Sequence, residues 1–196
     1  EANDIKRAMK KYSPKVYVAP NIPKYLNLNH EASDTNIRKI EGLLKICFLG
    51  RIAPVKNLNY ALKVLSKLKL MINFDIYGPK EDKKYWNLCK ETINSLPKSI
   101  DVQYMGPIEN ESVHKMFLNY DLFFLPTKGE NFGHVILESM SAGTPILIAD
   151  TTPWKNLEIS GVGWDIPLSS PNEFADAIEK MFYLNEKEYA KMRNSV

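Results

Sequence analysis

The sequence has few cysteines and no metal-binding motif. Only two of its 196 residues are cysteines, Cys47 and Cys89, and no Cys or His cluster has the spacing of a zinc site. We therefore expect neither a disulfide-stabilised secreted fold nor a structural metal centre. Free thiols, together with the lack of a recognisable signal peptide, predict a cytoplasmic protein.

Long apolar runs, internal repeats and a strong charge of one sign are also missing. No stretch approaches the length of a transmembrane helix. The net charge is only +3, and the lysines and arginines are spread over most of the chain, so nucleic acid is not an expected partner. Because basic patches can dock on anionic lipid, peripheral contact at the inner face of a membrane stays open.

Two common nucleotide-binding motifs are absent as well. The sequence has no G-x-x-x-x-G-K-[ST] motif, which excludes a P-loop nucleotidase. It has no G-x-G-x-x-G after a strand, which counts against NAD binding. A nucleotide site in this chain would have to be built differently.

What the sequence does contain is an alternation of short apolar runs with amphipathic stretches from about residue 45 onward. The apolar runs are typical of buried parallel strands and cover residues 45–49, 73–77, 102–105, 122–125 and 145–149. Helical patterns cover residues 57–70, 81–96, 111–120, 138–142 and 170–184, and Asn57 is expected to cap the first of them. The alternation predicts an α/β fold, a Rossmann-like doubly wound parallel sheet with helices on both faces.

The first part of the chain lacks this alternation. Residues 14–21 have the pattern of a short strand followed by turn residues, and residues 27–36 are polar and irregular. We therefore predict a lead-in or interdomain linker segment over residues 1–44 and one Rossmann-like domain over residues 45–196.

The loop after the first predicted core strand carries two cations. It reads Gly50-Arg51-Ile52-Ala53-Pro54-Val55-Lys56. Such a strand-to-helix turn places cations beside the backbone N–H groups of a helix start, which suits a diphosphate. From this loop alone, two solvated surface cations remain the alternative.

The loop before residue 138 carries a stronger signal. The helix start after Gly133 offers the backbone amides of His134 and Val135 to an anion. Glu130 lies on the loop and Glu138 in the second turn of the helix, where a carboxylate can accept two hydrogen bonds from a vicinal diol such as ribose. Apolar neighbours predict that Glu138 is buried, and a buried carboxylate needs partners.

Together these elements resemble the retaining glycosyltransferases of family 4. Glu130 to Glu138 matches the E-x7-E signature of that family, and Gly50-Arg51 with Lys56 matches its G-R-x4-K element. Residues 77–79, 104–106 and 120–126 match in order and spacing, and the similarity covers about residues 16–185. The resemblance implies a GT-B architecture, two Rossmann-like domains facing across a cleft. This chain would be the C-terminal, nucleotide-sugar-binding domain, without the N-terminal domain that mainly holds the acceptor.

The resemblance also implies roles for individual residues. Arg51 and Lys56 would stabilise the leaving diphosphate and Glu130 would contact the donor sugar, so these three would be the catalytic residues. The remaining donor-binding residues would be Gly50, Ile108 near the base, Asn131, Phe132, Gly133, His134, Val135 and, on the ribose, Glu138. No D-x-D pair occurs, which agrees with a reaction that needs no metal and no other cofactor.

Some positions depart from the pattern of the family. Asn57 stands where Gly is frequent after the lysine, and Asn131 replaces another frequent Gly. His134 could contact phosphate or be an ordinary exposed residue. Lys128 could neutralise phosphate or pair with Glu130, and core packing is the expected role of Trp164.

The implied reaction is transfer of a sugar, with retention, from a nucleoside-diphosphate sugar to a saccharide or lipid-linked acceptor. UDP- and GDP-sugars are the expected donors, and polysaccharide or lipopolysaccharide biosynthesis is the expected setting. Two alternatives stay open: a module that binds nucleotide sugar without catalysis, and a sugar-nucleotide epimerase of the same architecture.

Overall fold

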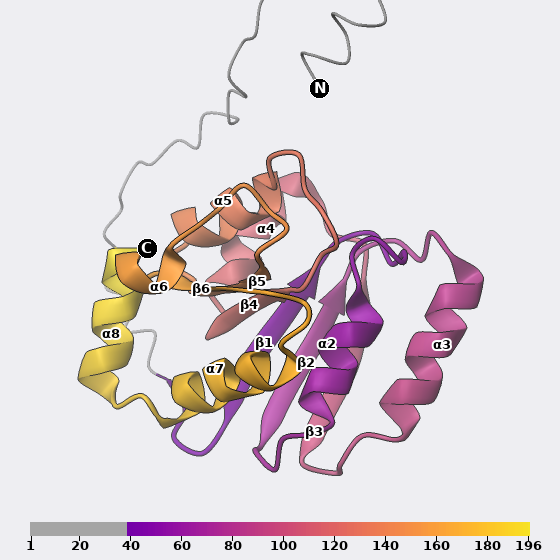
Figure 1. The fold of residues 1–196 in the computed structure, drawn as a ribbon, viewed down its shortest axis with the longest axis horizontal. Helices are drawn as coiled ribbons and strands as arrows, with labels where there is room; N and C mark the ends of the chain where they lie inside the picture. Colours follow the sequence, from indigo (N-terminus) through magenta and orange to yellow (C-terminus); the bar gives the residue numbers. More distant parts are fainter. Residues whose placement is uncertain (1–38) are drawn as a thin grey trace, which may run out of the picture. The chain divides into compact units, whose positions relative to one another are not determined.

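The computed structural model describes residues 39–196, and these residues contain a six-stranded parallel sheet (Figure 1). Its strands run in the spatial order β3-β2-β1-β4-β5-β6. Their bounds are β1 (Leu44–Leu49), β2 (Ile72–Tyr77), β3 (Ile100–Gly106), β4 (Leu122–Leu125), β5 (Ile146–Ala149) and β6 (Gly163–Ile166). Every neighbouring pair is parallel, which confirms the predicted Rossmann-like doubly wound sheet. The strand pattern predicted at residues 14–21 lies outside the described residues.

Helices follow the strands in turn. They are α2 (Leu58–Leu65), α3 (Lys83–Asn94), α4 (Asn110–Phe117), α5 (His134–Ser141), α6 (Leu157–Ser160), α7 (Pro171–Tyr183) and α8 (Glu186–Ser195). Because parallel crossovers are right-handed, α2 and α3 lie on one face of the sheet, and α4 and α5 lie on the other. The contacts agree, since α2 packs on α3 and α7, and α4 packs on α5.

The strand order reverses beside β1. From β1 the chain moves outward to β2 and β3 and then returns to place β4 on the other side of β1. The loops that follow β1 and β4 therefore leave the same edge of the sheet next to each other, at the topological switch point where such folds bind ligands.

The strands differ in how completely they are covered. All four residues of β4 and all four of β5 are buried. In β2, by contrast, Ile72, Phe74 and Ile76 are buried while the intervening Asn73 and Asp75 are half-buried. The prediction of buried strands is thus correct for β4 and β5 but holds for only one face of β2, whose other face is partly open to water.

The sequence patterns did not predict three elements of the structure: β6, the short helix α6 and α8. Helix α8 is mostly polar, and its one buried residue is Tyr189, whose hydroxyl donates to Asp121 Oδ1 at 2.8 Å. Burial raises the pKa of Asp121, which also accepts a bond from the backbone N–H of Lys45. The side chain of Asn185 accepts bonds from the N–H groups of Lys187 and Glu188, a capping box that begins the helix.

Both cysteines are buried as free thiols, Cys47 in β1 and Cys89 in α3. Burial raises the pKa of Cys89 to about 11, so this group stays a thiol at neutral pH.

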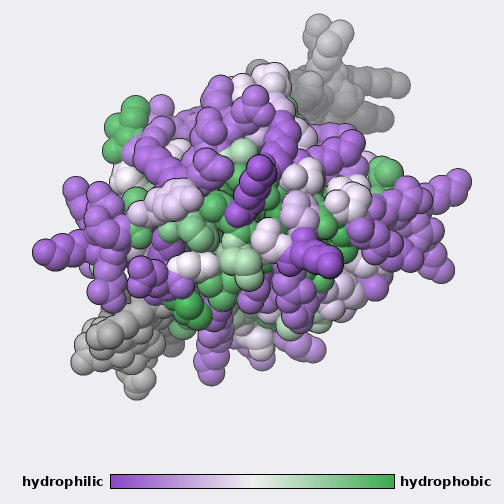
Figure 2. All heavy atoms as spheres, turned by 90° about the horizontal axis from the view of Figure 1, so that it is seen from below, coloured by the Kyte–Doolittle hydropathy of each residue, from purple (hydrophilic) through white to green (hydrophobic). Residues whose placement is uncertain are grey.

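Within residues 39–196, no helix has both the length and the apolar character needed to cross a bilayer. Figure 2 shows one face on which hydrophilic residues predominate and smaller apolar areas lie between them.

Candidate functional site

Two loops at the switch point are joined by hydrogen bonds. The loop after β4 approaches the loop after β1 closely enough for the backbone N–H of Lys128 to donate to the carbonyl oxygen of Val55 at 2.8 Å. The hydroxyl of the buried Thr127 donates to the same oxygen at 3.1 Å. These bonds fix the spacing between the cationic loop and the glutamate loop predicted from the sequence, so the structure brings the two loops together.

Lys56 and Glu130 form an ion pair across these loops. The Lys56 ammonium donates to Glu130 Oε1, and the two side chains are only 15% and 11% exposed. The stem of Lys56 packs beside Gly50, where an added Cβ would lie 3.5 Å from Lys56 Cγ. Lys56, rather than the exposed Lys128, is therefore the partner of Glu130. Pairing offsets the cost of burying both charges.

Arg51 is held differently, on the surface. Its Nη1 donates to both carboxylate oxygens of Glu81, at 2.9 and 2.7 Å, and the side chains are 57% and 46% exposed. Glu81 follows β2, the neighbour of β1, and sequence patterns did not single it out. An exposed pair of this kind contributes about 0–1 kcal/mol, so a phosphate could replace Glu81 at low cost.

The start of α5 has the features of an anion site. Gly133 precedes the helix with φ of 80°, and a Cβ there would lie 2.8 Å from Ile136 Cδ1. Glycine is therefore needed at this position. The N–H of Ile136 bonds back to the Gly133 carbonyl, whereas those of His134 and Val135 have no hydrogen-bond partner among the described residues. The two free N–H groups and the helix dipole favour a negative ligand.

Aromatic side chains fix the loop just before this helix. The Phe132 ring lies 4.8 Å from the His134 ring and 5.7 Å from the Trp154 ring, measured between centroids. The Trp154 indole N–H donates to the Phe132 carbonyl oxygen at 2.6 Å. Trp154 follows β5, and no sequence pattern indicated that it would lie here. His134 itself is exposed, so contact with phosphate remains a prediction.

The other predicted donor residues surround the same edge of the sheet. Glu138 lies in the second turn of α5 and is half-buried, so the expected burial is only partial. Asn131 is exposed on the loop before α5. Ile108 lies between β3 and α4, where it is half-buried against the core. These positions are compatible with contacts to ribose, sugar and base.

Asn57 corrects one sequence prediction and explains a departure from the family pattern. It precedes α2, but its side chain makes no capping bond, and its φ is 61°. Asn tolerates this left-handed conformation better than most residues, and Gly adopts it freely. The backbone shape, and not side-chain capping, therefore accounts for Asn at a position where Gly is frequent.

No cluster of three His, Cys, Asp or Glu side chains suited to a metal ion occurs in the part of the chain that the structure describes. Two ion pairs lie at the switch point instead, Lys56 with Glu130 and Arg51 with Glu81. A reaction without a metal remains a prediction.

Comparison with known proteins identifies the family. The family model described as "Glycosyl transferases group 1" matches residues 30–196. The uncharacterized glycosyltransferase MJ1607 of Methanocaldococcus jannaschii is 25% identical over 142 residues, which cover 69% of this chain and 35% of that protein. The sulfoquinovosyl transferase SQD2 of Arabidopsis thaliana is 28% identical over 105 residues, which cover 53% of this chain and 19% of that protein.

Solved structures share the fold. A variant of the S. aureus protein TarM, in complex with fondaparinux, alpha-GlcNAc-glycerol and UDP, superposes with a TM-score of 0.68 at 16% identity. This match covers 99% of the present chain and 38% of TarM. The chain thus spans about a third or less of the length of the two relatives described above. By its family model and its fold, the chain belongs to the glycosyl transferases of group 1, as the C-terminal domain of a GT-B glycosyltransferase.

Proposed function

We propose that this chain binds the nucleoside-diphosphate sugar of a retaining glycosyltransferase at the switch point between β1 and β4. The observation that carries the proposal is the largely buried Lys56–Glu130 pair on two joined loops, the second of which leads into α5, where two N–H groups have no partner among the described residues. A cation, a carboxylate and a helix N-terminus held within two joined loops match a sugar diphosphate in charge and hydrogen bonding.

The chemical task is to stabilise a leaving group. In glycosyl transfer, the bond between the anomeric carbon and a diphosphate oxygen breaks, and a bond to the acceptor oxygen forms as the acceptor hydroxyl loses its proton. Negative charge grows on the departing diphosphate. Lys56, Arg51 and the amides of His134 and Val135 are donors suited to that charge, and their loops hold them in place before the reaction.

Glu130 and Glu138 would serve the uncharged parts of the donor. Once phosphate oxygens attract the Lys56 ammonium, the Glu130 carboxylate can accept hydrogen bonds from the donor sugar. Glu138, at the same helix end, would accept bonds from the ribose diol. Backbone groups near Ile108 would meet the base, which makes the loop after β3 the determinant of base choice.

UDP- and GDP-sugars are the proposed donors, and UDP is the first to test because it is bound in the similar TarM complex. A saccharide or lipid-linked acceptor is proposed, held mainly by a second domain. This setting fits polysaccharide or lipopolysaccharide biosynthesis. WaaG, an enzyme of lipopolysaccharide biosynthesis, shares the fold with a TM-score of 0.65 at 16% identity. A cytoplasmic location with peripheral membrane contact belongs to the same proposal.

Slow hydrolysis of the donor tests the reaction without knowledge of the acceptor. Protein that includes both GT-B domains would be incubated with UDP- and GDP-sugars. Proton NMR would identify which anomer of the released sugar forms first. Retention predicts the anomer of the donor, and Lys56→Ala should abolish release.

The opposite anomer would contradict the retaining mechanism. Formation of an isomeric sugar nucleotide would indicate an epimerase, and saturable donor binding without turnover, even with saccharide acceptors present, would indicate a binding module.

A further inference from the structure

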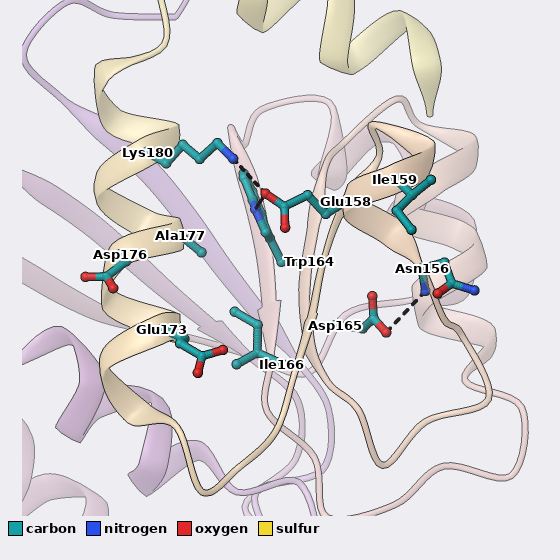
Figure 3. Close-up of a pocket in the computed structure, with 10 residues that line it drawn as sticks. All are labelled: Asn156, Glu158, Ile159, Trp164, Asp165, Ile166, Glu173, Asp176, Ala177 and Lys180. Carbon is teal, nitrogen blue, oxygen red and sulfur yellow. Dashed lines mark hydrogen bonds and ion pairs between the residues drawn. The ribbon is translucent and has the colours of Figure 1, made fainter.

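A groove lies beside β6, at one side of the described sheet and away from the loops of the proposed donor site. It has a volume of about 460 Å³ and runs between β6, α6 and α7 (Figure 3). Strand β6 ends the described sheet and pairs only with β5. None of the residues lining this groove is a predicted donor residue, so it is a surface with a separate role to explain.

The walls of this groove are acidic. Two of the acidic residues have hydrogen-bond partners. Glu158 accepts bonds from Lys180 at 2.6 Å and from the Trp164 indole at 3.3 Å. Asp165 accepts bonds from backbone N–H groups near the start of α6. The carboxylates of Glu173 and Asp176, one turn apart on α7, have no hydrogen-bond or ion-pair partner among the described residues. Lys180 is the one cation that lines the groove, and Glu158 already binds it.

The groove belongs to an acidic half of the domain. Residues 99–196 contain 14 aspartates and glutamates but 7 lysines and arginines, whereas residues 39–98 contain 5 and 12. The lining itself carries four carboxylates and the single cation Lys180, so the groove is negative although Lys67 lies beside it, bonded to Asn172.

An apolar contact surface adjoins these carboxylates. Ile159, on the wall formed by α6, is 88% exposed, more than any other large apolar side chain among the described residues. Trp164, Ile166 and Ala177 are the apolar residues on the inner side of the groove, each less than a tenth exposed. An isolated exposed isoleucine needs no explanation, but one beside a groove with unpaired charges provides an anchor for a partner side chain.

Charge decides among the possible occupants. A second copy related by a two-fold axis would bring the same carboxylates face to face, which is repulsive. Anionic lipid and nucleic acid carry the same sign of charge as the groove. We propose that the groove docks a basic segment of a partner protein, whose ammonium or guanidinium groups bind Glu173 and Asp176 while an apolar side chain packs on Ile159.

Fluorescence anisotropy with labelled peptides tests this proposal on the full 196-residue chain at physiological salt. The probe is a short peptide of alternating lysine and leucine. One control peptide replaces leucine by serine, and another replaces lysine by glutamate. The lysine–leucine peptide should bind saturably, and the combined change Glu173→Gln and Asp176→Asn should weaken it about tenfold, because two ion pairs are lost.

The matched control variant is Glu179→Gln, which removes one charge from the same helix outside the groove. Unchanged affinity in Glu179→Gln, with weaker binding of the serine peptide, supports docking in the groove. Equal loss in Glu179→Gln, equal binding of the serine peptide, or no binding of the lysine–leucine peptide overturns it. None of these changes touches the switch point, so failure here is separate from failure of the donor-site proposal.

Discussion

The switch point and the groove beside β6 satisfy their charges in opposite ways. At the switch point, Lys56 pairs with Glu130 and Arg51 with Glu81, and backbone bonds hold the loops together. In the groove, the carboxylates of Glu173 and Asp176 have no ion-pair partner among the described residues. The groove is thus not where the family motifs converge. The motif residues are held by partners that a ligand could replace, so their residue type and placement indicate function.

Lys56→Ala should have the largest effect on nucleoside diphosphate binding. A charge-assisted bond to phosphate contributes about 1.5–3 kcal/mol, so affinity should fall about 10- to 150-fold. Loss of the ammonium also leaves the Glu130 carboxylate unneutralised beside the phosphates. Isothermal titration calorimetry measures the change, with the exposed Lys128→Ala as control. Equal losses in the two variants would place the diphosphate elsewhere.

Glu138→Ala should weaken nucleotide binding by about tenfold, because a carboxylate that accepts bonds from ribose is removed. Inorganic pyrophosphate has no ribose, so its affinity should not change. Competition of pyrophosphate with a fluorescent nucleotide separates the two effects. A parallel loss of pyrophosphate affinity would mean that Glu138 acts on the loop structure and not on the ribose.

Arg51→Ala should weaken diphosphate binding only about two- to fivefold, because this cation is exposed and screened by water. The loss should shrink as salt is added. Glu81→Ala frees Arg51 from its partner and should have an effect of opposite sign. Titrations at low and high salt test both variants. A loss for Arg51→Ala that equals the loss for Lys56→Ala at high salt would contradict the distinction between the exposed and the buried cation.

Glu130→Gln should tighten binding of the diphosphate alone by a few-fold, because Lys56 loses its competing carboxylate. Binding of the sugar nucleotide should gain less, since Gln accepts fewer hydrogen bonds from the donor sugar. The ratio of the two affinities is the measured quantity. An unchanged ratio would remove Glu130 from the sugar site.

The smallest effect concerns the groove. Glu173→Gln combined with Asp176→Asn should leave nucleotide affinity unchanged, since both residues belong to α7 and not to the loops after β1 and β4. The same calorimetric titration checks this expectation. A marked loss of nucleotide affinity would show that the two regions are coupled and not independent.

The strands that the sequence predicted best are those buried on both faces. β4 and β5 are continuous apolar runs, so their position follows from composition alone. β6 was missed because Gly163, Trp164, Asp165 and Ile166 form no such run, although Trp164 is buried as expected. α8 was missed because a single residue, Tyr189, is buried in it.

The site was predictable in its residue types but not in its pairing. Lys56 and Glu130 were both identified from loop chemistry, yet their contact depends on β1 and β4 being neighbours. Glu81 and Trp154 follow other strands, so strand order places them and no local pattern indicates them. The capping role predicted for Asn57 was wrong because its backbone is left-handed.

Calorimetric titration of this chain with UDP, GDP and ADP tests the donor-site account most directly. The account predicts saturable binding of one diphosphate, weakened in Lys56→Ala and Glu138→Ala, and the preferred diphosphate would identify the base. If none of the three binds saturably, either to this chain or to protein that includes both GT-B domains, the donor-site account is contradicted.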